Sequence, residues 1–358
     1  MLLERAVGAG VAPAAVAQWG RVGETPETVV SGTARLGPAT TAATQRTFFD
    51  LASLTKPLVT TTLTLLATRA GAVSLSTTVD TVLTELRGSD VGALDVVHLL
   101  SHSAGLPAWL PLYCIAEGDP ELLIKRLGEV PIEESPGTRV VYSCVGFVIL
   151  GLMLARISGT GLDAVFRREV LGETGLTDEL GFLPDRDTQS LSGGAAKAVV
   201  ETRLVRELGL DPRWIPPPEP GLPDDGNARF LGGVAGNAGL FGTAVGVRAL
   251  AAEYLDGGGA LLRPEERELA TTQQTPGLEQ AWGLGWQLAQ SSGSSAGPTL
   301  ASQAFGHTGF TGVSVWCDPV VRSVFVLLTN RNHPGHREND LHPLRRRFHA
   351  LAMASNRR

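Results

Sequence analysis

The stretch Phe49-Asp50-Leu51-Ala52-Ser53-Leu54-Thr55-Lys56-Pro57 leads an apolar run into a serine followed three residues later by a lysine. In a helix that begins here, residues i and i+3 lie on one face about one turn apart, so the hydroxyl of Ser53 and the amine of Lys56 can meet. A serine hydroxyl is a poor nucleophile until a neighbouring base takes its proton. Lysine can be that base where burial and nearby positive charge lower its pKa, whereas arginine stays protonated.

The scarcity of lysine gives this pair more weight. A short Ser-x-x-Lys match can arise by chance at the start of a surface helix, so the motif alone is only a hypothesis. Of the 30 basic residues, however, only Lys56, Lys125 and Lys197 are lysines. A chain that nearly avoids lysine places one where arginine would not serve, and we therefore expect Ser53 to be a nucleophile and Lys56 its base.

Further segments follow in an order that is typical of one enzyme family. They are Leu99-Leu100-Ser101-His102-Ser103-Ala104-Gly105-Leu106-Pro107, Tyr142-Ser143-Cys144, Asp225-Gly226-Asn227-Ala228, Gly236-Asn237-Ala238-Gly239-Leu240-Phe241, Trp282-Gly283-Leu284-Gly285-Trp286 and His307-Thr308-Gly309. Together with the first stretch they resemble the beta-lactamase-like serine hydrolases across nearly the whole chain. The sequence is most similar to the class C beta-lactamase branch, which includes family VIII carboxylesterases and D-alanyl peptidases.

This resemblance implies roles for the matching residues. Ser53 would form an acyl-enzyme, while Lys56 and Tyr142 would carry the proton between the nucleophile and the leaving group. The backbone amides of Ser53 and Phe310 would form the oxyanion hole, which stabilises the charge that develops on the carbonyl oxygen. The reaction needs no cofactor or metal, and the sequence contains no motif for either.

Two residues depart from the family pattern. Cys144 ends the second motif where the family usually has asparagine, and a thiol cannot replace the hydrogen bonds of an amide. His307 begins the third motif in place of the usual lysine, ahead of Thr308 and Gly309, and a mostly neutral imidazole is a weaker anchor for a carboxylate. Both changes favour an ester substrate. Trp109, followed by Leu110, is a candidate lining of an apolar acyl pocket, although ordinary packing explains both equally well.

We expect an α+β fold, beta-lactamase/transpeptidase-like, in which an antiparallel sheet is flanked by helices and carries an inserted, mainly helical region. Residues 1–60 and 240–358 would form the sheet domain and residues 61–239 the helical domain, with the active site in the cleft between them. The patterns predict strands over 14–19, 27–33, 282–289, 309–317 and 323–329. They predict helices over 53–72, 95–100, 121–127, 144–158, 161–170, 244–254 and 341–355.

Composition excludes several classes of partner. The net charge is −6 and the basic residues form no long stripe, which argues against binding to nucleic acid or to an anionic membrane. The run Arg345-Arg346-Arg347 is expected on the solvated face of a helix. The three cysteines, Cys114, Cys144 and Cys317, have irregular spacing that suits neither a disulfide framework nor a metal knuckle. With no signal-peptide pattern at the N-terminus, we expect a cytoplasmic protein.

Other candidate sites have simpler explanations. Gly293-Ser294-Ser295-Ala296-Gly297 matches the Gly-x-Ser-x-Gly nucleophile elbow, but it lies in a Ser/Gly-rich tract without the strand and helix that the elbow requires. His98 and His102 are spaced as a metal pair on one helix, yet no third ligand accompanies them, so packing or capping is expected. Cys144 opens an apolar helix and is expected to be a packed thiol and not a nucleophile.

The sequence therefore predicts a serine hydrolase acting through a Ser53 acyl-enzyme, with a small carboxylic ester as the favoured substrate. A beta-lactamase or D-alanyl-D-alanine carboxypeptidase is the alternative within the enzymes. A catalytically silent ligand-binding protein on the same fold is the alternative from another class, and Cys144 is the residue that keeps it open.

Overall fold

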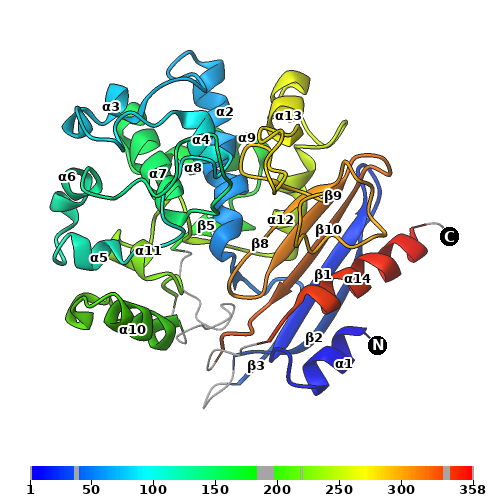
Figure 1. Cartoon of the computed structure of the whole chain (residues 1–358). Coiled ribbons are helices and arrows are strands. Elements are labelled where there is room, and N and C mark those ends of the chain that lie inside the picture. Colours follow the sequence, from blue (N-terminus) through cyan, green and yellow to red (C-terminus); the bar gives the residue numbers. More distant parts are fainter. Residues whose placement is uncertain are drawn as a thin grey trace.

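A seven-stranded antiparallel sheet joins the two ends of the chain (Figure 1). The computed structural model describes residues 2–35, 40–183, 197–217, 219, 221–333 and 339–356. The order of the strands is β3-β2-β1-β10-β9-β8-β7. Their bounds are β1 (Ala14–Arg21), β2 (Glu27–Arg35), β3 (Thr41–Ala42), β7 (Gln287–Leu288), β8 (Phe305–Thr308), β9 (Ser314–Asp318) and β10 (Ser323–Thr329).

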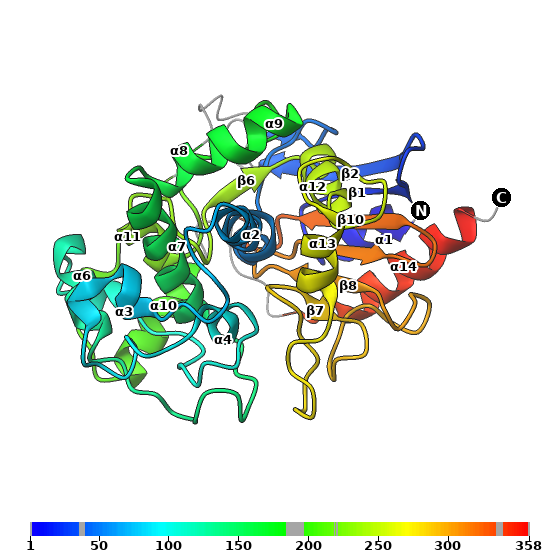
Figure 2. The ribbon, with the colours of Figure 1, turned by 90° about the horizontal axis from the view of Figure 1, so that it is seen from above.

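Both faces of this sheet are buried at its central strands β1, β10 and β9, because side chains alternate between two hydrophobic clusters. On β10, Val324 and Val326 belong to the main core, whereas Phe325 and Leu327 point to the opposite side. Figure 2 shows helices on both faces of the sheet. On the main-core side α12 (Ala244–Ala252) packs against β1, β9 and β10, and on the other side lie α1 (Leu2–Gly8) and α14 (His342–Ser355).

The rest of the chain is mainly helical and lies beside the sheet (Figure 1). A small antiparallel sheet in the order β4-β6-β5 connects the two parts, formed by β4 (Phe49–Asp50), β5 (Leu180–Phe182) and β6 (Leu240–Gly242). The helices are α2 (Thr62–Arg69), α3 (Val79–Val82), α4 (Val96–Leu100), α5 (Leu112–Ile115), α6 (Leu123–Leu127), α7 (Cys144–Ser158), α8 (Leu162–Phe166), α9 (Gly172–Thr174), α10 (Lys197–Glu207), α11 (Gly226–Phe230) and α13 (Pro264–Thr271).

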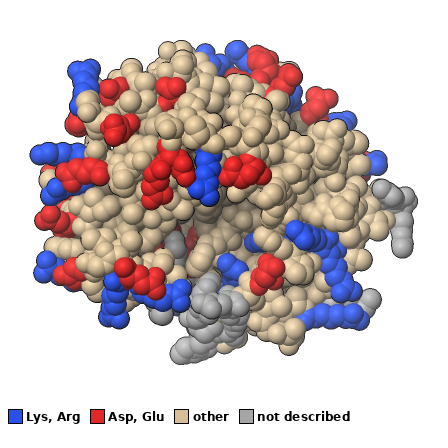
Figure 3. Space-filling model, viewed as in Figure 1, with Lys and Arg blue, Asp and Glu red and all other residues tan. Residues whose placement is uncertain are grey.

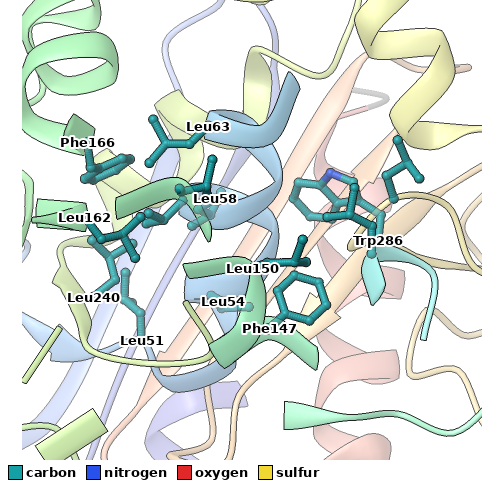
Figure 4. Packing of buried hydrophobic residues seen from close by; sticks show 14 of the residues in the cluster. Leu51, Leu54, Leu58, Leu63, Phe147, Leu150, Leu162, Phe166, Leu240 and Trp286 are labelled. Carbon is teal, nitrogen blue, oxygen red and sulfur yellow. The ribbon is translucent and has the colours of Figure 1, made fainter. Parts of the chain in front are cut away.

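Helix α7 is the centre of the main core, as its uninterrupted apolar sequence predicts. Its first turn is capped by Ser143, whose Oγ accepts a hydrogen bond from the amide of Gly146 at 3.3 Å. Phe147 and Leu150 of α7 share one hydrophobic cluster with Leu54 and Leu58, and α7 contacts the segment Lys56–Thr61 that follows the Ser53 turn (Figure 4). The helix that anchors the second motif therefore packs directly on the segment that carries the first.

Several expectations about individual elements need correction. The region 282–289 is mostly a turn, and only β7 pairs with the sheet, because Gly283 and Gly285 fold back against Ala270 and Thr61 with no room for a Cβ. The strand expected at 309–317 begins at Ser314, and β8, which the sequence did not reveal, precedes it. Helix α1 was also not predicted.

No single helix in the described part of the chain is long and apolar enough to cross a membrane. One pair of helices, Cys144–Ser158 with Leu162–Thr174, reaches that length together but is bent by 73°.

Asn330, directly after β10, links the ends of the neighbouring strands β10, β1 and β2. Its Oδ1 accepts a hydrogen bond from the amide of Ala14 at 2.7 Å, and its Nδ2 donates to the carbonyls of Thr33 and Ala34 at 3.2 and 2.8 Å. Removing the side chain leaves buried backbone groups without partners. We predict that Asn330→Ala lowers the free energy of unfolding by about 1–3 kcal/mol in urea titrations, whereas the exposed control Ser302→Ala changes it by less than about 0.5 kcal/mol. Equal values for both variants would contradict this role.

Candidate active site

The serine of the first motif lies in a tight turn between β4 and the following helical segment. Ala52–Leu54 forms a short 3-10 turn and Lys56–Thr61 a π-helical turn that continues into α2. Ala52 has a left-handed backbone conformation with φ of 46°, which is rare outside glycine. The Asp50 carboxylate holds this residue by accepting a hydrogen bond from its amide at 2.8 Å. Local strain of this kind clusters at functional sites.

Lys56 reaches back to the serine, as the spacing predicts. Its Nζ donates hydrogen bonds to Ser53 Oγ at 3.1 Å, to the carbonyl of Asn237 at 3.1 Å and to Cys144 Sγ at 3.4 Å. The three contacts match the three donors of an ammonium group. Sequence reasoning singled out the segment of Asn237 but gave it no role, because a backbone carbonyl leaves no signal in residue type.

The protonation state of Lys56 differs from the expectation that burial and nearby positive charge would lower its pKa. Burial by itself lowers the pKa of Lys56, but the neighbouring Cys144 and Tyr142 favour the ammonium and the pKa lies above its ordinary value. Burial also raises the pKa of the Tyr142 phenol, and the charge of Lys56 offsets this only in part. The resting site therefore holds a protonated Lys56 beside a neutral Tyr142, with the ammonium 5.0 Å from the centre of the phenol ring.

The third motif, His307-Thr308-Gly309, lies next to the Ser53 turn. His307 and Thr308 end β8, and Gly309 follows in a turn next to the Ser53 segment. A Cβ on Gly309 would approach the carbonyl of Leu51 to 2.9 Å, so this contact requires glycine. Phe310 comes next, and its carbonyl accepts a hydrogen bond from Nε of Arg331 at 2.8 Å.

His307 is a neutral imidazole in this structure. Burial is the main cause that lowers its pKa to about 3, and the charge of Lys56 acts in the same direction. Its Nδ1 lies 2.8 Å from the Thr308 carbonyl, which can only accept, so Nδ1 carries the proton. Nε2 then presents a buried lone pair that has no partner in the described part of the chain. A neutral ring agrees with the expectation that His307 is a poor carboxylate anchor.

His102 contacts two residues of the second motif, Tyr142 and Ser143. It follows α4 with a φ of 58°, so it does not share a helix with His98 as the spacing suggested. Its Nδ1 accepts a hydrogen bond from the amide of Ser143 at 3.0 Å, and its ring lies 4.5 Å from that of Tyr142. The expected packing role is confirmed, since His102 fixes the backbone between Tyr142 and Cys144.

Most of these residues line a pocket of about 620 Å³ between the helical part and the sheet, although Lys56 and His102 do not. The space-filling view shows this face hollowed near its middle, with acidic and basic residues mixed around it (Figure 3). Trp109 lines the pocket, whereas its neighbour Leu110 packs against the core. The other residues predicted for the site that line it are Ser53, Tyr142, Cys144, His307, Thr308, Gly309 and Phe310.

Arg345 corrects the expectation of a solvated arginine run. Arg346 and Arg347 are exposed, but Arg345 is only 5% exposed and lines the pocket. It donates a hydrogen bond to the carbonyl of Val313 at 3.0 Å, while its Nε has no partner among the residues that the structure describes. The spacing held a usable signal, because Arg345 lies three residues before the buried Phe348 and therefore on the apolar face of α14.

The Gly-x-Ser-x-Gly segment lacks the strand and helix that flank a nucleophile elbow. Gly293–Gly297 lies in irregular turns, and the three cysteines are free thiols. Within the described ranges, no group of three or more histidine, cysteine or acidic side chains is arranged to hold a metal ion.

Solved structures with this architecture define the fold. The structure described as "EstCE1, a hydrolase with promiscuous acyltransferase activity" superposes with a TM-score of 0.74 at 22% identity, covering 97% of this chain and 96% of that chain. A structure described as "A class C beta-lactamase" gives 0.72 at 20% identity, covering 99% and 94%. The fold is therefore beta-lactamase/transpeptidase-like, as the sequence indicated.

Sequence comparison identifies the family. The family model described as Beta-lactamase matches residues 11–350. A protein of Escherichia coli K12 named "Putative D-alanyl-D-alanine carboxypeptidase" is 31% identical in an alignment of 263 residues that covers 67% of this chain and 57% of that protein. The present chain thus matches little more than half of that relative's length. The chain belongs to the beta-lactamase family of serine hydrolases.

Burial of histidines at and near the site makes stability depend on pH. Burial lowers the pKa of His102, of His307 to about 3 and of His349 to about 4, from an ordinary value of about 6.5. Below pH 6.5 the unfolded chain takes up protons that the folded chain refuses. The contribution of these neutral histidines to the free energy of unfolding is therefore fully present above pH 6.5 and is lost as the pH falls towards 4.

We predict that the free energy of unfolding falls by up to about 1.4 kcal/mol per pH unit for each of these histidines between about pH 6.5 and 4. Urea titrations at pH 7.5 and 5.0 measure this slope. The variant His349→Gln should show a shallower dependence than the unaltered protein. Identical slopes in the two proteins would show that His349 accepts its proton in the folded state.

Proposed function

We propose that this protein hydrolyses small carboxylic esters through an acyl-enzyme on Ser53. The contact between Lys56 Nζ and Ser53 Oγ carries the proposal, because it puts an amine that becomes a proton acceptor on deprotonation next to a hydroxyl that lines the pocket. The family supports an acyl-transfer reaction but leaves the substrate open, and the ester rests on this chain's own departures from the family pattern.

In the proposed acylation step, Ser53 Oγ bonds to the carbonyl carbon while its proton passes to the Lys56–Tyr142 pair. The carbonyl oxygen becomes negatively charged and is stabilised by the amides of Ser53 and Phe310. When the tetrahedral intermediate collapses, the bond to the alcohol oxygen breaks and the pair returns the proton to the departing alkoxide. Arg331 contributes by holding the carbonyl of Phe310 and placing its guanidinium 5.5 Å from that ring.

Water completes the cycle by the reverse sequence. It attacks the acyl carbon and gives its proton to the same pair, and the bond to Ser53 breaks as Oγ is protonated again, releasing the carboxylic acid. Since Lys56 is an ammonium and Tyr142 a phenol at rest, the pair must lose one proton before it can accept that of Ser53. The competent fraction of the enzyme thus grows as the pH rises.

Cys144 and His307 favour an ester over an amide substrate. In place of the asparagine that is usual in the family, Cys144 offers the pocket a thiol, which is a weak hydrogen-bonding group. His307 is neutral and cannot supply the charge of a lysine. An ester lacks the amide N–H that would need a partner here, so it loses less from both changes.

The proposal is tested by comparing a short-chain nitrophenyl ester with a chromogenic cephalosporin. We predict that the unaltered protein prefers the ester and that Ser53→Ala loses at least about a thousandfold of that activity. Ser295→Ala, which removes the serine of the Gly-x-Ser-x-Gly sequence, is the matched control and should retain it. Ester hydrolysis that survives Ser53→Ala would refute the mechanism, and a lack of activity on both substrates would favour a silent binding protein.

Cys144 provides a second test of substrate preference. We predict that Cys144→Asn raises cephalosporin turnover relative to ester turnover, because the amide restores hydrogen bonds to Lys56 and to an amide-bearing substrate. Initial rates on both substrates give the ratio, with Cys114→Ala as a control at a thiol outside the pocket. An unchanged ratio would remove Cys144 as a reason to prefer an ester.

One observation favours a peptidase as the second candidate function. The buried guanidinium of Arg345 lines the pocket, and none of the described carboxylates lies within ion-pair distance of it. Burial, aided by the charge of Arg331, lowers the pKa of Arg345 to about 9, although Asp340 acts in the opposite direction. A substrate carboxylate would compensate for this buried charge, and the relative from Escherichia coli is named for a peptidase whose substrate ends in one.

Arg345 therefore distinguishes substrates by their charge. We predict that Arg345→Gln lowers kcat/KM for a carboxylate-bearing ester at least about tenfold more than for its neutral methyl ester. Arg347→Gln, two residues further along the same helix and exposed, should leave both values unchanged. If Arg345→Gln lowers both values equally, Arg345 is structural and the support for the peptidase disappears.

A further inference from the structure

Helix α10 presents two different faces. Val200 and Leu204, four residues apart, line the pocket. Glu201 and Val205, also four residues apart, are fully buried against the body of the protein. Side chains at i and i+4 share a helix face, so the helix separates a wall that faces the pocket from a face that anchors it.

The anchoring face packs on a small hydrophobic cluster of its own. Val205 joins Tyr113 and Cys114 there, and Trp109 packs against the same cluster. Trp109 also lines the pocket, so the wall formed by Val200 and Leu204 continues into an aromatic ring. We call these three side chains the α10 wall.

A buried ion pair fixes the helix at this position. Glu201 and Arg229 of α11 have no exposed side-chain surface, and their Oε2 and NH2 atoms lie 3.0 Å apart. Arg229 also donates to the carbonyls of Pro216, Pro223 and Asp224 at 3.1, 3.0 and 2.8 Å. A buried pair is costly unless its remaining donors are satisfied, and here the backbone satisfies them.

Further contacts of Glu201 connect α10 to Lys56, the lysine beside the nucleophile. Glu201 Oε1 accepts a hydrogen bond from the amide of Gly226 at 2.8 Å, at the start of α11. The preceding residue, Asp225, accepts from Nδ2 of Asn237 at 3.1 Å. The Asn237 carbonyl is in turn one of the three acceptors of Lys56. Helix α10 and the catalytic lysine are thus positioned by one connected set of contacts.

The two sides of the pocket differ in chemistry. Arg345 and His342 of α14 line it on the side of the sheet, and α10 lines it on the helical side (Figure 1). Asp224 and Asp225 also line it, but both carboxylates already accept hydrogen bonds, from Asn332 and Asn237 respectively. Their negative charge disfavours an anionic group beside α10. An uncharged chain therefore fits the helical side, and a polar leaving group the other.

We propose that the α10 wall sets which acyl chains the enzyme accepts, with Val200 and Leu204 as specificity-determining residues and the Glu201–Arg229 pair as the positioning device. This inference rests on the acyl transfer by Ser53 proposed above. It names the substrate class more closely, as esters whose acyl part is an uncharged, apolar chain.

The test is a series of nitrophenyl esters from acetate to decanoate. Leu204→Trp shortens the space and should lower the ratio of kcat/KM for hexanoate to that for acetate at least about tenfold. Leu204→Ala lengthens it and should raise the ratio for decanoate to acetate at least about threefold. Leu208→Ala, just beyond the helix and 51% exposed, is the matched control. Glu201→Gln should raise KM for hexanoate more than it lowers kcat for acetate.

Labelling of Ser53 by alkyl fluorophosphonates of increasing length separates the two proposals. In this reaction Ser53 Oγ bonds to phosphorus while the P–F bond breaks, releasing fluoride and the hydroxyl proton. If no ester is turned over, the esterase proposal fails, but the Leu204 variants must still shift the length dependence of labelling. If esters are turned over and neither Leu204 variant moves the profile, the α10 wall is refuted and the esterase stands. A series of alkyl acetates varies the alcohol part of the ester while the acyl part stays constant. If the Leu204 variants change the chain-length dependence only in that series, the acyl assignment is wrong.

Discussion

The site depends on the hydrogen bonds that the buried ammonium of Lys56 makes. A buried cation is costly in a protein interior unless hydrogen bonds replace its lost hydration. Lys56 finds that replacement in a hydroxyl, a backbone carbonyl and a thiol, with none of the described carboxylates at ion-pair distance. Each acceptor comes from a different part of the chain. The fold must bring the Ser53 turn, α7 and the Asn237 loop together before the lysine can be accommodated.

This requirement explains why the surrounding structure is so constrained. The start of α7 is fixed by Ser143 and His102, and the Ser53 turn is held by Asp50 in a backbone conformation that is unusual for alanine. Gly309 lets the third motif approach this turn closely. The charge state follows from the same contacts. Cys144 and Tyr142 favour the ammonium form of Lys56 and outweigh the effect of burial, which by itself lowers the pKa of this lysine.

Much of this could be predicted from the sequence, because the pattern that reveals an element is the same pattern that forms it. The apolar run of α7 and the i, i+3 spacing of Ser53 and Lys56 are local and appear directly in the chain. The contacts that sequence reasoning missed are not local. The Asn237 carbonyl carries no signature in residue type, and β8 is too short for its periodicity to be recognised. Three consecutive arginines suggest a solvated run, but Arg345 lies on the apolar face of α14 with Phe348 and is buried.

The residue that carries the covalent intermediate can be identified directly. The protein would be mixed with a nitrophenyl ester, quenched in acid within the first turnover and digested for peptide mass spectrometry. The peptide that contains Ser53 should carry the mass of one acyl group, and the same peptide should carry none when Ser53 is alanine. An acyl group on Cys144, or ester turnover without any acylated peptide, would contradict it.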